Sequence, residues 1–341
     1  MAQIGRNPGF FVVTNYMHYP GENTMKLSRL LVTCLMALAP FAAQAEVEQF
    51  KIMAPANPGG GFDTVARTLG EALQASGQVK SVVVENKAGA GGAIGMAQFV
   101  NNEKGNPNAL LVAGAVTVGA LETNKSPVNF GMVTPVARLM GEFNVLVVSA
   151  SSPYKTLKDL MAAYKANPGA VSIGGGSAGG IDHIMAALMS EKVGVDPDKL
   201  NYIPFAGGGE GKAAILGNQI AAYISGYGEL ADLIKAGKVR ALALSADKKQ
   251  ADIPVPTLKE QGVDVVVYNW RGVFGAPGIN AAQKAALIKM VETAVKAPSW
   301  KAKAEKFEWL DMLQTGDSFK SFLDAEQKRT AAIVKKLKLG N

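Results

Sequence analysis

Residues 53–63 have the sequence MAPANPGGGFD. An apolar segment at residues 50–54 predicts a β-strand before this glycine run, and the apolar spacing after it predicts an amphipathic helix that begins near residue 63 or 64. Successive glycines leave backbone N–H groups open to a ligand and permit positive φ angles. The helix start adds unpaired N–H groups and a partial positive charge. A strand, a glycine turn and a helix N-terminus in this order are typical of a carboxylate or phosphate site.

Glycine turns of the same kind recur three times, at residues 89–92, 174–180 and 207–209. Each turn follows a predicted strand, and the carboxyl ends of parallel strands meet at one edge of a sheet. We therefore expect the four turns to face one cleft that holds a small anion. Valine at Gly60 or Gly91 is expected to abolish binding in a protein that still folds, because the side chain would occupy the anion's place.

The remaining pattern predicts an α/β protein with two lobes. Three apolar strands alternate with helices in the first part of the chain, which is typical of a parallel sheet covered on both faces. The same alternation returns after residue 170, and the residues from 280 onward read as helices. Two extended segments near residues 145 and 268 connect the two sets. We predict a first lobe of residues 46–146 plus 268–341 and a second lobe of residues 147–267, joined by two crossing strands.

The N-terminal segment is predicted to be a secretory signal peptide at residues 25–45. It has a basic start, a short apolar core and the sequence Ala43-Gln44-Ala45, after which cleavage is expected. The apolar run is too short for a transmembrane anchor, and Pro40 interrupts it. Residues 1–24 then read as an upstream extension from a start codon called too early. A lipoprotein site at Cys34 is the alternative, although it would lie in the middle of the apolar core.

Composition excludes several classes of site. Cys34 is the sole cysteine and lies in the predicted signal, so the mature chain has no disulfide and no cysteine-built site. His183 would be the sole histidine of the mature chain, which leaves transition metals without ligands. The net charge of +7 comes from scattered lysines without the basic stripe expected of a nucleic-acid-binding protein. We therefore predict no metal, no cofactor and no nucleic-acid partner.

Two glycine motifs resemble nucleotide sites only in part. GGGSAG at residues 174–179 matches G-x-G-x-x-G, but the next predicted strand ends in Pro204-Phe205 without the acidic residue that a dinucleotide site needs. GGGEGKA at residues 207–213 is one residue short of a P-loop and has Ala213 where a magnesium-binding hydroxyl is required. Both motifs are better interpreted as part of the anion cleft.

Two polar groups have both a structural and a functional interpretation. A hydrolase triad could be composed of Ser177, Asp182 and His183. However, these residues lie within one turn and one helix start, which would not place the serine nucleophile and the histidine base in the geometry that a triad needs. The Asp-His pair is more consistent with hydrogen bonding at a helix start. Asp63 has a structural interpretation as a helix N-cap. Its functional interpretation is that it orients the first glycine turn or accepts a hydrogen bond from a ligand amine or hydroxyl, and one residue can serve both purposes.

Several motifs together resemble a known family, the substrate-binding proteins of tripartite tricarboxylate transporters, also called the Bordetella uptake gene (Bug) or TctC-like family. The likeness extends from residue 46 to about residue 337. The matching motifs are PGGGFD at 58–63, ENKAGAGG at 85–92, GGS at 175–177 with Asp182-His183, IPF at 203–205 and WRG at 270–272.

The resemblance implies a periplasmic binding protein of the type 2 kind, with the ligand cleft between its two lobes and no catalytic activity. It implies a monomeric periplasmic receptor that binds a small carboxylate, such as a di- or tricarboxylate, and delivers it to a two-subunit membrane permease. After signal cleavage the chain would not span the membrane. The ligand-binding residues carried over are Gly59, Gly60, Gly61, Phe62, Asp63, Gly89, Ala90, Gly91, Gly92, Thr117, Ser177, Ala178, Gly179, Phe205, Ala206, Gly207 and Ser225.

The chain departs from the family pattern at two places. It has Phe205-Ala206-Gly207 where many members carry Tyr-Lys-Gly, and Val116-Thr117 where a Ser-Thr pair is usual. The lost hydroxyl and amine affect the choice of ligand. Two other functions remain open from the sequence. One is a secreted hydrolase centred on Ser177, and the other is a ligand-sensing module of a signalling receptor, which shares the fold and differs only in its partner.

Overall fold

The computed structural model describes residues 47–339. The predicted signal peptide and the upstream extension therefore lie outside the described residues, as does the alternative lipid site at Cys34. Within residues 47–339, no helix combines the length and the apolar character needed to cross a bilayer.

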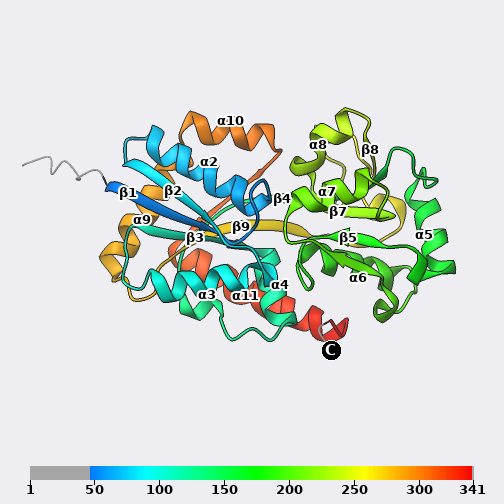
Figure 1. The fold of residues 1–341 in the computed structure, drawn as a ribbon, viewed down its shortest axis with the longest axis horizontal. Helices are drawn as coiled ribbons and strands as arrows, with labels where there is room; N and C mark the ends of the chain where they lie inside the picture. The colour runs from blue at the N-terminus through cyan, green and yellow to red at the C-terminus, as the bar shows by residue number, and fades with distance from the viewer. Residues whose placement is uncertain (1–46, 340–341) are drawn as a thin grey trace, which may run out of the picture. The chain divides into compact units, whose positions relative to one another are not determined.

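The described residues form a mixed α/β fold in which ten strands belong to one sheet (Figure 1). The strand order is β2-β1-β3-β9-β4-β7-β5-β6, and β8 and β10 also pair with β4. The strands are β1 (Val47–Ala54), β2 (Val79–Asn86), β3 (Ala109–Gly114), β4 (Thr134–Ser149), β5 (Ile173–Gly175), β6 (Tyr202–Pro204), β7 (Ala222–Gly226), β8 (Val239–Leu244), β9 (Tyr268–Gly275) and β10 (Leu310–Thr315).

Ten α-helices cover this sheet within the described part of the chain. They are α2 (Gly61–Ala75), α3 (Ala93–Asn102), α4 (Ala115–Thr123), α5 (Leu157–Ala166), α6 (Ile181–Lys192), α7 (Gly208–Leu216), α8 (Tyr227–Lys235), α9 (Ala281–Ala294), α10 (Pro298–Lys306) and α11 (Gly316–Lys336). Short 3₁₀ turns lie at Ala90–Gly92, Phe130–Met132, Pro168–Ala170, Pro197–Lys199 and Lys259–Gln261.

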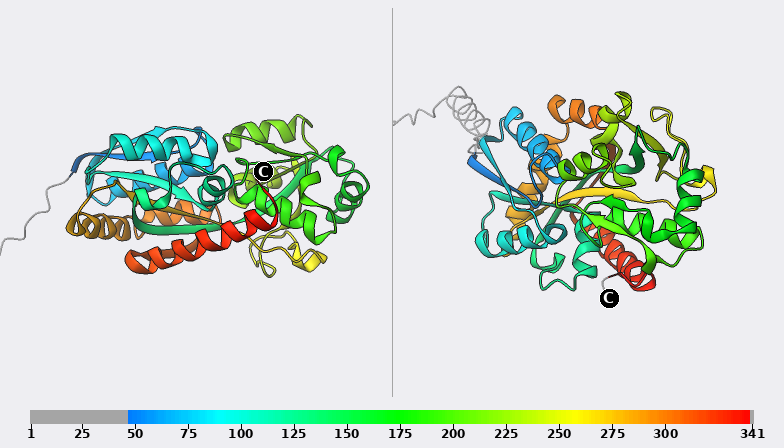
Figure 2. Two further views of the ribbon diagram at one scale, coloured as in Figure 1. Left: turned by 90° about the horizontal axis from the view of Figure 1, so that it is seen from below. Right: turned by 45° about the vertical axis from the view of Figure 1, so that its right-hand side comes forward.

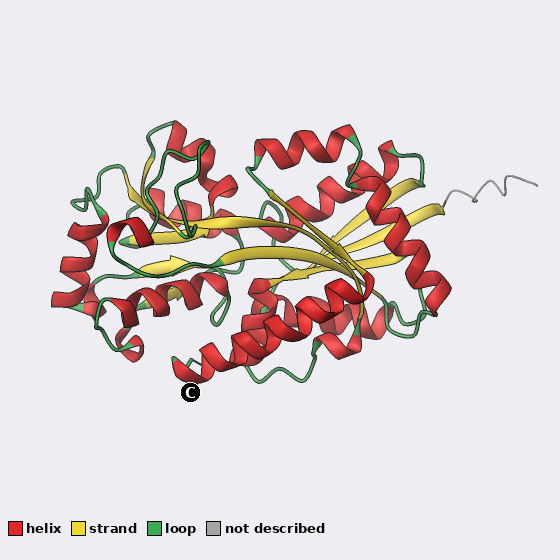
Figure 3. Cartoon of the chain, turned by 180° about the vertical axis from the view of Figure 1, so that it is seen from behind, coloured by secondary structure: helices red, strands yellow, loops and turns green. Residues whose placement is uncertain are grey.

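The sheet has two halves that share the 16-residue strand β4. In the first half, β1 pairs in parallel with β2 and β3, and β9 runs antiparallel to both β3 and β4. In the second half, β5 pairs in parallel with β6 and β7, while β7 and β8 run antiparallel to β4. Figure 3 shows the two long strands that run through the molecule. The lobe boundaries at residues 146/147 and 267/268 remain a prediction.

Alternation of apolar side chains along the first strands produces two covered faces. On β1, Met53 packs with α3, α4 and α11, whereas Phe50 and Ile52 pack with α2, α9 and α10. On β3, Leu111 and Leu110 divide between the same two clusters. Figure 1 shows α2 and α10 on one side of these strands and α3 and α4 on the other. The apolar runs therefore reflect burial on both faces, as the sequence predicted.

The C-terminal segment differs from the all-helical prediction. Residues Leu310–Thr315 form β10, which pairs antiparallel with β4 and keeps its residues only partly buried. Half-burial at the sheet edge leaves a mixed polar and apolar sequence, so the segment lacks the apolar run of a central strand. The following helix α11 runs toward the second half of the sheet (Figure 2). There the Nζ atom of Lys336 lies 2.6 Å from Oε1 of Glu191 on α6.

Candidate ligand-binding pocket

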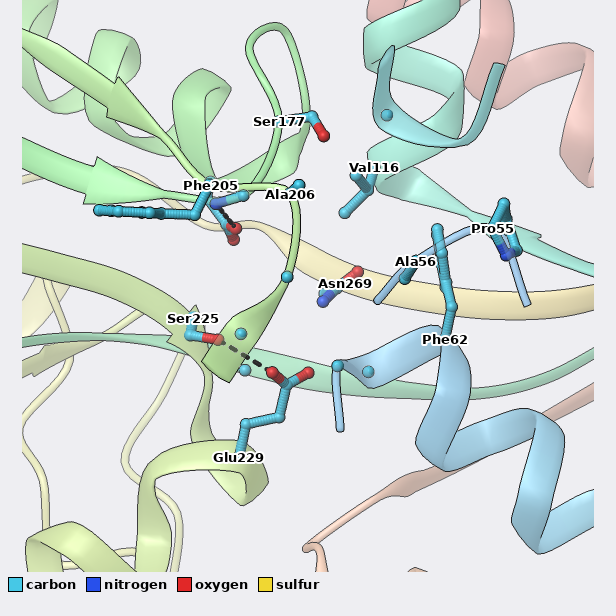
Figure 4. A pocket seen from close by; sticks show the side chains of 18 of the residues that line it. Pro55, Ala56, Phe62, Val116, Ser177, Phe205, Ala206, Ser225, Glu229 and Asn269 are labelled. Atoms are coloured by element: carbon cyan, nitrogen blue, oxygen red, sulfur yellow. Dashed lines mark hydrogen bonds between the residues drawn. The ribbon is translucent and has the colours of Figure 1, made fainter. Parts of the chain in front are cut away.

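One pocket is lined by residues of all four glycine turns. The first turn and the start of α2 contribute Gly60 and Gly61, the second turn contributes Gly91, the third contributes Ser177, and the fourth contributes Gly207. Figure 4 shows this pocket, with Ser177, Phe62 and Glu229 on different walls. The pocket has a volume of about 80 Å³, while a single water needs about 10–15 Å³. It therefore suits a small molecule.

The sequence-predicted residues fall into two groups. Nine of them line the pocket: Gly60, Gly61, Phe62, Gly91, Ser177, Phe205, Ala206, Gly207 and Ser225. Eight lie outside its lining: Gly59, Asp63, Gly89, Ala90, Gly92, Thr117, Ala178 and Gly179. Seven of these eight belong to the same turns or to the start of α2, where several of them shape the backbone, and Thr117 lies on α4. The whole set remains a prediction about ligand contacts.

Positive φ angles explain the glycines of the second turn. Gly89, Gly91 and Gly92 have φ angles of 131°, 62° and 103°, and Ala90 between them has 45°. Glycine adopts such angles without the steric cost of a Cβ atom. The turn closes with a hydrogen bond of 3.0 Å from the N–H of Gly92 to the carbonyl of Gly89. The sequence of this turn therefore follows from its backbone conformation.

Asp63 orients the first glycine turn. The helix α2 begins at Gly61 with Gly60 as its N-cap, two or three residues earlier than predicted, so Asp63 lies in the first turn and is not the cap. Its carboxylate accepts hydrogen bonds from the N–H of Gly59 at 2.9 Å, from Arg67 Nε at 3.0 Å and from Asn86 Nδ2 at 2.9 Å. Burial opposes its ionisation, but the bonds from Arg67, Gly59 and Asn86 hold the pKa of Asp63 below its usual value.

Removal of this carboxylate is expected to loosen the first turn. We expect Asp63→Ala to lower the free energy of unfolding by about 2–3 kcal/mol, because three donors lose a charged acceptor in a buried place. Urea unfolding at pH 7 measures the loss. Because the pKa of Asp63 is lowered in the folded state, the loss shrinks as the pH falls below the ordinary carboxyl pKa. Glu71→Ala, an exposed change on the same helix, should be nearly neutral, and an equal loss in both variants would contradict the assignment.

The third turn is shaped by Asp182 and His183. The N–H of Gly176 donates to Asp182 Oδ2 at 2.8 Å, and the N–H of Gly179 donates to His183 Nδ1 at 3.0 Å. The imidazole stacks on Tyr202 with ring centroids 4.2 Å apart. Burial lowers the pKa of His183 to about 4, so the ring is neutral and its Nδ1 can accept. Both side chains hold backbone amides, which favours the helix-start interpretation over the triad.

A buried charged cluster forms part of the pocket wall, and the sequence did not predict it. Nη2 of Arg271 on β9 lies 2.8 Å from Oε1 of Glu229 on α8 and also contacts Glu142 on β4. The side chains of Arg271, Glu142 and Glu229 are 4%, 1% and 13% exposed. Asn269 Nδ2 donates to Glu142 at 3.1 Å, and Ser225 Oγ donates to Glu229 at 3.2 Å. The available signal was a charged residue within an otherwise apolar strand, at Glu142 and at Arg271.

The carboxyl groups of Glu142, Glu229 and Asp182 all lie near the guanidinium of Arg271. Burial raises the pKa of Glu142 to about 8, with Arg271 opposing the shift and Glu229 and Asp182 adding to it. Burial also raises the pKa of Asp182 to about 7, against the hydrogen bond from Gly176 and with repulsion from Glu229. Near neutral pH the cluster therefore keeps protons that ordinary carboxyl groups would have lost.

The raised pKa values predict a pH dependence of stability. Between the ordinary carboxyl pKa near 4 and the folded values near 7 and 8, the folded state binds more protons than the unfolded state. The stabilisation from Glu142 and Asp182 is therefore fully present near pH 4. It is lost as the pH rises through the folded-state pKa values. We expect the melting temperature of Glu142→Gln to fall less than that of the wild type between pH 5 and 9. The exposed change Glu305→Gln should follow the wild type, and parallel curves for all three proteins would refute the effect.

The comparison with family models decides the relationship. Residues 65–339 match the model described as the tripartite tricarboxylate transporter family receptor, TctC. The chain belongs to the TctC family. Members of this family are solute-binding receptors of tripartite transporters, as the resemblance in the motifs indicated.

Relatives and solved structures agree with membership of the TctC family. Protein BugT of Bordetella pertussis is 28% identical over 91% of this chain and 98% of its own length. The periplasmic binding protein BugD superposes with a TM-score of 0.76 at 22% identity, covering 86% of this chain and 98% of BugD. MatC from Rhodopseudomonas palustris, solved with bound malate, gives a TM-score of 0.77 at 22% identity, covering 84% and 99%. The fold is thus that of periplasmic binding proteins.

The two departures from the TctC-family pattern lie on the pocket wall. Val116, Phe205 and Ala206 line the pocket, whereas Thr117 is fully buried outside it, with no hydrogen-bond partner for its hydroxyl among the described residues. The Phe205 ring packs edge-on against Tyr223, with centroids 6.2 Å apart. Apolar groups therefore form the wall at the positions where many members carry a hydroxyl and an amine.

Proposed function

We propose that this chain is a periplasmic solute-binding receptor that captures a small carboxylate and delivers it to a two-subunit membrane permease. Secretion would depend on the signal peptide at residues 25–45, and the mature receptor would act as a monomer without catalysis. The proposal follows from TctC family membership and from the pocket. MatC, which has the same fold, was solved with malate.

The observation that carries this proposal is the convergence of four glycine turns and two helix starts on one small pocket. Gly60 caps α2 and Gly207 caps α7, and both residues line the pocket. The first turn of each helix has N–H groups without an intrahelical partner. The helix dipoles add partial positive charge at the same place. Such a pocket binds one carboxylate group through backbone amides.

We further propose that the two predicted lobes, residues 46–146 plus 268–341 and residues 147–267, close on the ligand. The turns on opposite sides of the pocket already contact each other, since Asn57 Nδ2 donates to Glu210 Oε1 on α7 at 2.8 Å. The crossing strands β4 and β9 would act as the hinge. A ligand that contacts both sides favours the closed form by its differential affinity.

Thermal melting of residues 46–341 against small carboxylates tests the binding function. The panel contains citrate, succinate, malate, glutamate and aromatic acids, with NAD and ATP as controls. A ligand at a hundred times its dissociation constant adds about 2.7 kcal/mol to the free energy of unfolding, so a binder raises the melting temperature. If no acid changes the melting temperature and mass spectrometry of the denatured protein finds no retained acid, the carboxylate function is rejected.

Delivery to a permease needs a separate test. The mature receptor, loaded with the acid found above and immobilised, is exposed to detergent-solubilised membranes of its host. Recovery of a two-subunit membrane permease supports the transport proposal. Recovery of a sensor kinase without a permease would replace it with the signalling role.

A further inference from the structure

The side-chain carboxylate of Glu229 lies between the starts of α2 and α7, which both line the pocket. A Cβ atom added to Gly61 at the start of α2 would collide with the Arg271 guanidinium and with Glu229 Oε1, and one added to Gly208 at the start of α7 would lie 2.9 Å from Glu229 Oε2. Glu229 itself lines the pocket and is largely buried (Figure 4). The ion pair of Glu229 and Arg271 therefore occupies part of the region formed by these helix starts.

Three carboxyl groups and one guanidinium meet at this end of the pocket. Glu229, Asp182 and Arg271 line the pocket, and Glu142 contacts Arg271. Arg271 compensates one of the three carboxyl groups, and its Nη2 atom is shared between Glu142 and Glu229. Glu142 and Asp182 keep protons near neutral pH because their pKa values are raised, and a cationic group of a ligand can replace those protons. A second carboxylate would instead face the carboxylate of Glu229, and like charges repel strongly at low dielectric.

An unpartnered acceptor lies at the same end. Asn269 lines the pocket and is only 3% exposed, and its Oδ1 atom has no hydrogen-bond partner among the described residues. Its Nδ2 atom donates to Oε1 of Glu142 at 3.1 Å, which leaves Oδ1 as the acceptor without a partner. Figure 4 shows the Asn269 side chain between Val116 and Glu229. A buried free acceptor requires a donor, and the carboxyl groups beside it favour a cationic one.

We propose that the ligand is a monocarboxylate that carries a cationic nitrogen at its other end. Its carboxylate binds backbone amides of the glycine turns, on the side of the pocket that Gly91 and Ser177 line. Its ammonium, or another protonated nitrogen, binds Glu229, Asp182 and Asn269 Oδ1. This inference rests on the proposed carboxylate receptor and narrows its ligand class, because it excludes a second carboxylate as the preferred end group.

Matched acids of equal chain length test this proposal. Calorimetric titration of the wild type compares 4-aminobutanoate, butanoate and succinate, and the corresponding six-carbon set of 6-aminohexanoate, hexanoate and adipate. We expect 4-aminobutanoate or 6-aminohexanoate to bind at least about tenfold tighter than the dicarboxylate of the same chain length. One hydrogen bond between charged groups contributes a free energy of this size. Equal or tighter binding of the dicarboxylates overturns the inference while the carboxylate receptor stands. Absence of binding by all six acids rejects the receptor proposal as well.

A substitution at Glu229 gives an independent test. Glu229→Gln should weaken the preferred amino acid at least about tenfold and strengthen the matching dicarboxylate, since it removes one like charge. The matched control is Asp232→Asn, an exposed change on the same helix that should alter neither affinity. If Glu229→Gln folds and leaves the order of the two ligands unchanged, the assignment of Glu229 is wrong. The wild-type comparison decides the ligand class even if this variant fails to fold.

Discussion

Replacement of Arg271 by methionine lowers the free energy of unfolding by about 3–5 kcal/mol. The guanidinium is 4% exposed and lies against Glu142 and Glu229, with Asp182 nearby. Methionine keeps much of the side-chain volume but leaves buried carboxyl groups without a counter-charge. Urea unfolding at pH 7, followed by circular dichroism, measures the loss.

Two further variants separate charge from packing at this site. Arg329→Met removes an exposed arginine whose partner Glu326 lies on the same helix, so it should cost at most about 1 kcal/mol. Adding Glu229→Gln to Arg271→Met should recover part of the loss, because it removes one uncompensated charge. A loss below about 1 kcal/mol for Arg271→Met, or no recovery in the double variant, would contradict this electrostatic account.

Valine at position 60 is expected to abolish ligand binding in a protein that still folds. Gly60 has a φ angle of −82°, which any residue adopts, and an added Cβ would lie 3.3 Å from the carbonyl of Asn57 and 3.6 Å from the N–H of Gly208. The larger valine side chain would fill the space between the starts of α2 and α7. Titration calorimetry on Gly60→Val, with its melting temperature measured in parallel, tests both parts.

The matched control for Gly60→Val is Gly209→Val. Gly209 lies in the first turn of α7 with nothing within 4 Å of an added Cβ, and it does not line the pocket. The sequence-based expectation treated Gly91 like Gly60, and for Gly91 the structure contradicts it. Gly91 has a φ angle of +62°, and its added Cβ would collide with Ala120, so valine there strains the fold itself. Undiminished affinity in Gly60→Val would reject the pocket as the binding site.

The sequence predicted those parts of the fold and the pocket whose local backbone conformation requires particular residue types. Apolar runs predicted the central strands because both faces of the sheet are covered, as at Leu110 and Leu111. Glycine runs predicted the turns, because positive φ angles and helix starts leave a local signature in the sequence. Nine of the predicted residues consequently line one pocket.

The charged cluster could not be predicted because its members meet only in three dimensions. Glu142, Glu229 and Arg271 come from β4, α8 and β9, and no spacing in the sequence relates them. The pairing partner of a buried charge depends on the strand order, and that order places β9 next to β4. The edge strand β10 was missed for a related reason, since its partly buried residues carry little periodic signal.

The strand order also determines when the molecule can be completed during synthesis. The first half of the sheet begins with β1, β2 and β3, but its remaining positions are filled by β9 and β10 from the end of the chain. A polypeptide that emerges N-terminus first must therefore keep β3 unpaired on one side until residue 275 is available. Contacts at this separation are slow to form. The edge of β3 that pairs with β9 accordingly stays exposed until the C-terminal part of the chain is available.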